Sequence, residues 1–133
     1  LFRSRLDKIV NERNNLFSNY LKILKELPLN LLEIPSSAMS SVHLAVILLS
    51  EELTKKHSVI FDKMRSNNIG VQLHYIPVHT QPFYRNLGFL PSHFPEAIKY
   101  SNRAISIPLY PGLSFIDQEY ISQLLRKCIK SCF

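Results

Sequence analysis

A nearly continuous apolar run at residues 42–49, broken only by His43, constrains the fold of this sequence most. The run is far shorter than the roughly 18 residues that a membrane-spanning helix needs. Its length and its content of valine and isoleucine are typical of a β-strand that is covered on both faces. A chain of 133 residues has room for one ordinary domain. We therefore expect a single domain over residues 1–133 in which other elements cover this strand.

The rest of the sequence predicts helices around that strand, because apolar side chains recur at three- and four-residue steps and Pro28 ends the first such segment. Helices are expected at residues 6–24, 50–70, 95–105 and from 114 onward. Further short strands are expected at residues 71–75 and 105–108. This order predicts a small α/β (α+β) domain, in which a short sheet is packed with helices and follows a long N-terminal helix.

Residues 76–95 differ from the rest because they hold half of the chain's eight prolines, interleaved with histidine, tyrosine and phenylalanine. A loop of this length is usually functional or disordered, and its aromatic content argues against disorder. Prolines restrict the backbone, so that imidazole and phenol groups lose less entropy when they bind a ligand. Those groups can donate hydrogen bonds to sugar hydroxyls or phosphate oxygens. The alternative is a set of loop side chains satisfied by the backbone.

Other chemistry is poorly supported. The formal net charge of +6 comes from scattered basic residues without a nucleic-acid motif, and three isolated glycines exclude a glycine-rich phosphate loop. Cys128 and Cys132 lack partners at zinc-site spacing, and Pro77 prevents the helical spacing that His74 and His79 would need to share a metal. We expect no metal, no membrane contact and no catalytic constellation. Two cysteines suggest a reducing compartment, hence the cytoplasm.

The sequence resembles the C-terminal small domain of the DegT/DnrJ/StrS family of pyridoxal-phosphate sugar aminotransferases. The motifs that carry the resemblance are GVQLHYIPVHTQPFYRNLGF at residues 70–89 and FPEAIKYSNRAISIPLYPGLS at residues 94–114, followed by DQEYI at 117–121. Upstream, SSVHL at residues 40–44 resembles a strand of the small domain, and RLDKIVNER at 5–13 resembles the family's linking helix. Within the family it most resembles the UDP-4-amino-4,6-dideoxy-N-acetyl-altrosamine transaminase branch, on the route to pseudaminic acid.

The resemblance implies a fold-type-I enzyme that moves an amino group, usually from glutamate, to a UDP-linked keto-sugar. It also implies a homodimer whose pyridoxal phosphate is bound to a lysine of a large domain. The chain begins at Leu1 rather than methionine, and no lysine has the family's glycine-rich setting. We therefore expect this chain to be a fragment that lacks the large domain. Such a fragment should bind no cofactor and should be inactive by itself.

The resemblance also implies which residues bind the substrate. His74 and Tyr75 match a His-Tyr pair that faces the nucleotide sugar, while His79 and Gln81 match a following His-x-Gln that shapes the loop and can touch the sugar. Tyr84 and Arg85 are weaker candidates. Two alternatives stay open, namely a stand-alone binding or assembly module from a split or decayed gene, and a basic nucleic-acid-binding domain.

Overall fold

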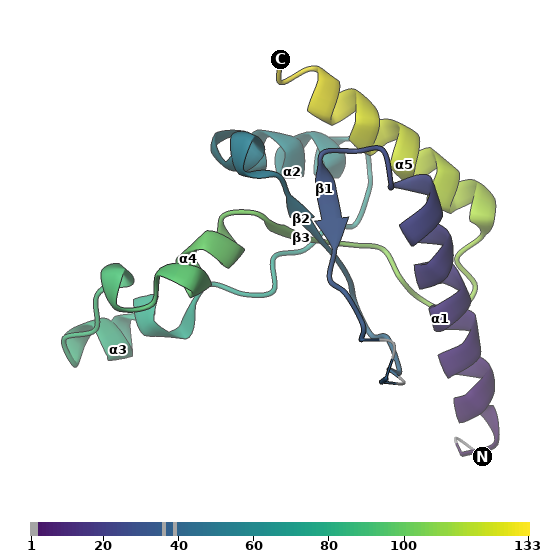
Figure 1. The fold of residues 1–133 in the computed structure, drawn as a ribbon, viewed down its shortest axis with the longest axis horizontal. Coiled ribbons are helices and arrows are strands. Elements are labelled where there is room, and N and C mark those ends of the chain that lie inside the picture. Colours follow the sequence, from purple (N-terminus) through teal and green to yellow (C-terminus); the bar gives the residue numbers. More distant parts are fainter. Residues whose placement is uncertain (1–2, 36, 39) are drawn as a thin grey trace.

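The computed structural model describes residues 3–35, 37–38 and 40–133. After a 3₁₀ turn at Arg3–Arg5, helix α1 spans Leu6–Ile23 and ends ahead of Pro28, as predicted. Its inner face buries Leu16, Phe17 and Tyr20. Amphipathic helices are stabilised mainly by packing of such a face rather than by intrinsic propensity, and α1 packs along α5, which spans Phe115–Lys130 (Figure 1).

The sheet is antiparallel and has the order β1-β2-β3, with strands at Leu29–Leu31, Ala45–Leu49 and Ala104–Ile107. In the centre, Ile47 lies opposite Leu31 on one side and Ile105 on the other. Consecutive residues of β2 are buried, and successive side chains of a strand point to opposite faces. The prediction of a strand covered on both faces is thereby confirmed.

Helices around the sheet complete the core. After β2, a 3₁₀ helix at Glu51–Lys56 leads into α2 at His57–Ser66, which packs against α5. Ser114 caps α5, since its hydroxyl accepts a hydrogen bond from the Asp117 backbone N–H at 3.0 Å. In the described part of the chain, no helix has the length and apolar character needed to span a membrane.

Two strand predictions need correction. The first strand of the sheet, β1, lies at residues where no strand was expected. Residues 71–75 do not form a strand, because only Gln72 pairs with Ser106 in an isolated bridge before the chain turns away. The three-strand sheet therefore includes β1 in place of that segment.

Residues 76–102 form an arm that projects from this body (Figure 1). Where an irregular loop was expected, short helical turns occupy the arm, ending in helix α4. These elements are 3₁₀ turns at Val78–Thr80 and Pro91–His93, α3 at Pro82–Asn86 and α4 at Pro95–Ser101. The expected helix at 95–105 is therefore shorter, and β3 begins within its range. No residue from 81 to 97 is buried, although large apolar side chains such as Phe83 and Leu87 lie there.

Candidate functional site

His74 lies where the chain leaves the sheet. Two backbone hydrogen bonds fasten Gln72 to Ser106 of β3, with N···O distances of 3.0 and 2.8 Å. Two residues further on, the half-buried His74 ring places Nδ1 2.7 Å from the Ser106 hydroxyl. The backbone bridge and the side-chain contact together fix His74 relative to a buried strand.

Tyr75 is 76% exposed, and its ring meets the His74 ring edge-on with 4.7 Å between centroids. The peptide bond that joins the two residues is cis. Tyr75 lines a groove of about 380 Å³ together with Gln81, Gln72, Leu73, Ile76 and Phe61. Two of the predicted residues, Tyr75 and Gln81, thus line one exposed groove, and His74 lies beside it in contact with the Tyr75 ring. We call this groove, together with the adjoining His74, the His-Tyr groove.

His79 is placed differently from Gln81. Its side chain is 8% exposed and its ring packs on Phe94, with 4.8 Å between centroids. In the part of the chain that the structure describes, its buried Nε2 atom has no hydrogen-bond partner. His79 lines an apolar hollow of about 390 Å³ with Tyr84, Phe89 and Phe94. His79 therefore packs within the arm, apart from the groove that Tyr75 and Gln81 line.

Tyr84 and Arg85, the weaker candidates, lie on α3. The Tyr84 ring contacts Phe83 and Phe89 edge-on, which makes it part of the aromatic packing of the arm. Arg85 is exposed, and among the described residues its guanidinium makes no hydrogen bond or ion pair. A guanidinium of this kind is available to a phosphate group.

Ser106 is the residue that sequence reasoning missed. It is 4% exposed in a strand whose four residues are all buried. The available signal was a single hydroxyl in the apolar sequence Ala-Ile-Ser-Ile, because a buried polar group needs a hydrogen-bond partner. That partner could not be identified without the path of residues 71–75.

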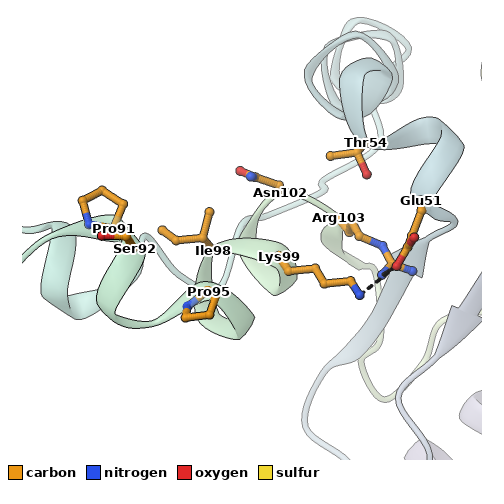
Figure 2. A pocket seen from close by; sticks show the side chains of 9 residues that line it. All are labelled: Glu51, Thr54, Pro91, Ser92, Pro95, Ile98, Lys99, Asn102 and Arg103. Atoms are coloured by element: carbon orange, nitrogen blue, oxygen red, sulfur yellow. Dashed lines mark ion pairs between the residues drawn. The ribbon is translucent and has the colours of Figure 1, made fainter.

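The largest cavity, of about 550 Å³, lies elsewhere, at the base of the arm (Figure 2). Lys99 of α4 reaches Glu51 at 2.8 Å, and Arg103 lies 3.7 Å from the same carboxylate. The hydrogen bond with Lys99 lowers the pKa of Glu51, and the same contact raises the pKa of Lys99. None of the predicted site residues lines this cavity, so we assign these charges to holding the arm.

The described residues do not fit pyridoxal phosphate. A lysine that forms a Schiff base must react as a neutral amine, usually in a desolvated setting. No lysine of the chain is buried, and the lysine that lines the largest cavity is held protonated by Glu51. Across the described part of the chain, no group of three or more histidine, cysteine, aspartate or glutamate side chains could hold a metal ion.

Comparison with known proteins shows which family the chain belongs to. The sequence profile of the DegT/DnrJ/EryC1/StrS aminotransferase family matches residues 4–126. The chain belongs to this family. It is 30% identical over 133 residues to the spore coat polysaccharide biosynthesis protein SpsC of Bacillus subtilis, covering 95% of this chain but 33% of SpsC. The resemblance stated from the motifs is confirmed at the level of the family.

Solved structures of two aminotransferases contain the same fold. The putative sugar aminotransferase Spr1654 of Streptococcus pneumoniae, in its PMP-form, matches with a TM-score of 0.91 at 21% identity, over 98% of this chain and 33% of that one. Helicobacter pylori PseC, an aminotransferase involved in the biosynthesis of pseudoaminic acid, matches with a TM-score of 0.88 at 22% identity, over 96% of this chain and 34% of that one. The chain thus spans about a third of its relatives.

Proposed function

We propose that this chain is the substrate-covering small domain of an enzyme that transfers an amino group to a nucleotide-linked keto-sugar. The observation that carries the proposal is the exposed His-Tyr groove in a chain whose residues 4–126 match an aminotransferase family. Sugar nucleotides present hydroxyls and a diphosphate, which imidazole, phenol and amide groups bind by hydrogen bonds. The net charge of +6 favours the approach of such an anion.

The residues of the groove have separate tasks in this proposal. His74, tied to β3 through Ser106, donates a hydrogen bond to an oxygen of the sugar or its diphosphate. Tyr75 covers the sugar with its exposed ring and offers its hydroxyl as a second donor. Gln81 closes the groove from the start of α3 with an amide that can donate and accept.

The cofactor of the proposed reaction is pyridoxal phosphate, which supplies the amino-group carrier and electron sink. Because the lysines described here do not fit it, we place the cofactor-bearing lysine outside this chain. Glutamate as the amino donor, a homodimeric enzyme and a cytoplasmic location are part of the same proposal. The proposed substrate is a UDP-linked keto-sugar of the pseudaminic acid branch, with PseC as one supporting neighbour among several branches.

The half-reaction with the keto-sugar and the half-reaction with glutamate can be measured separately. Comparing them distinguishes this proposal from a structural role for the groove. In the enzyme that contains this segment, His74→Ala and Tyr75→Ala should each raise the KM for the keto-sugar about three- to tenfold, the range expected for one lost hydrogen bond. The half-reaction with glutamate should be unchanged, because it does not involve the nucleotide sugar.

A matched control is Tyr120→Ala, since Tyr120 is also exposed but lies on α5. This variant should leave both half-reactions unaltered. Wild-type kinetics with the keto-sugar in both groove variants would contradict the assignment of the site. Equal losses in both half-reactions would indicate a general structural defect instead.

A further inference from the structure

Ser106 occupies an unusual place for a polar side chain. Strand β3 is buried at all four positions, and Ser106 carries its single side-chain hydroxyl. The backbone of Ser106 pairs with Val46 of β2 on one side and with Gln72 on the other. These pairings fix the backbone of Ser106, and with it the position of its Cβ atom, between two neighbouring segments.

The hydrogen bond between Ser106 and His74 favours one tautomer of the imidazole. The Ser106 Oγ atom lies 2.7 Å from His74 Nδ1, and it makes no other hydrogen bond with the described residues. If Nδ1 donated to Oγ, the hydroxyl proton would remain buried without an acceptor, which is costly. If the hydroxyl donates to Nδ1, both groups are satisfied. The proton of the neutral ring is then on Nε2.

We propose that Ser106 is a positioning residue that holds His74 as the Nε2–H tautomer, so that the imidazole presents a hydrogen-bond donor to an oxygen of the nucleotide sugar. The substrate in this statement rests on the proposed function. The link between Ser106 and His74 does not, because it follows from the distance and the burial alone. Partners of this kind commonly fix the tautomer and orientation of functional histidines.

The chain provides a matched control. Ser122 on α5 is also 4% exposed, and its hydroxyl donates to the Ile23 carbonyl at 3.3 Å. Ser122→Ala therefore removes a buried serine hydroxyl with a backbone partner, far along the chain from His74. Any effect of Ser106→Ala that Ser122→Ala shares is a general consequence of losing a buried hydrogen bond.

The test is nitrogen NMR of the histidine rings in the 133-residue chain. The wild-type protein and Ser122→Ala should show His74 as the Nε2–H tautomer, whereas Ser106→Ala should show a mixture of both tautomers. Ser106→Cys, which keeps the side-chain size but offers a weak donor, should resemble Ser106→Ala and serves as the variant of choice if alanine unfolds the chain. An unchanged His74 tautomer in a folded Ser106→Ala or Ser106→Cys protein would overturn the assignment.

Titration of the enzyme that contains this segment with UDP-N-acetylglucosamine separates this inference from the proposed function. The apparent Kd should rise about three- to tenfold in Ser106→Ala and stay constant in Ser122→Ala. If the sugar nucleotide shifts no His74 signal in the wild-type enzyme that contains this segment, the proposed substrate is contradicted, and the tautomer measurement still decides the role of Ser106. If the tautomer changes in Ser106→Ala but the Kd does not, Ser106 does not position His74 for the ligand.

Discussion

At the scale of single residues, a buried amide joins the two longest helices. Gln118 of α5 is fully buried; its Nε2 atom donates to the Leu16 carbonyl at 2.9 Å, and its Oε1 atom accepts from Asn19 at 3.0 Å. Both helix partners lie about a hundred residues away in sequence. A buried amide with its partners satisfied fixes the registration of α1 on α5, because a shifted pairing would leave it without partners.

Replacing Gln118 should therefore destabilise the chain. We expect Gln118→Ala to lower the free energy of unfolding by about 2–3 kcal/mol, from lost packing and from a half-buried Asn19 donor without its partner. Gln123→Ala, on the exposed side of the same helix, should change it by less than about 0.5 kcal/mol. Urea unfolding of both variants checks this, and similar midpoints would contradict a structural role for the Gln118 amide.

His79 gives a second prediction at this scale. Because its buried Nε2 has no described partner and its ring packs on Phe94, a ring of similar shape without polar atoms should be tolerated. We expect His79→Phe to leave the free energy of unfolding unchanged or raise it by up to about 1 kcal/mol, and His79→Ala to lower it by about 2 kcal/mol. A loss in His79→Phe as large as in His79→Ala would show that Nε2 has an essential partner.

At the scale of elements, the arm is held to the body by charges at its base. Lys99 and Arg103 both reach Glu51, and Arg103 also donates to the Leu49 carbonyl at 2.6 Å (Figure 2). The lowered pKa of Glu51 means that this contribution to stability is present above the ordinary pKa of the carboxyl group. It is lost as the pH falls through the lowered value.

The Glu51 contact predicts pH-dependent protection of the arm. At neutral pH, Glu51→Gln should speed amide exchange in α4 by roughly two- to fivefold, a modest effect because the pair is exposed. The difference from wild type should vanish at a pH below the lowered pKa of Glu51, where the carboxyl group is neutral. The control is Glu52→Gln, because the Glu52 carboxylate contacts Ser50 rather than the arm. Equal exchange in α4 of wild type and Glu51→Gln at neutral pH would show that the contact does not hold the arm.

At the scale of the whole molecule, the body of the fold could be predicted and the sheet only in part. The apolar periodicity of α1 and α5, and the continuous run that becomes β2, report burial directly. The strand β1 has only three residues, and its pairing with β2 is a long-range contact that leaves no local signal. Residues 71–75 have the composition of a strand, but after Gln72 they leave the sheet for the arm.

The candidate site, too, could be predicted only in part. The motif predicted His74, Tyr75, His79 and Gln81 as candidates, but it could not show that His79 turns inward on Phe94 while Gln81 shares a groove with Tyr75. Ser106 is distant from His74 in sequence and adjacent in space. Such a contact depends on where residues 71–75 pair with β3, and a single sequence does not contain that information.

The exposed apolar side chains of the arm, such as Phe83 and Leu87, fit a chain that packs against further protein surface.

The main proposal is that the chain forms part of a pyridoxal-phosphate sugar aminotransferase. The most direct test is the intact mass and visible spectrum of the native protein that carries this segment. We expect a yellow protein much heavier than 15.4 kDa whose absorption changes on addition of glutamate. A colourless native protein of 15.4 kDa would contradict the proposal and favour a stand-alone binding or assembly module.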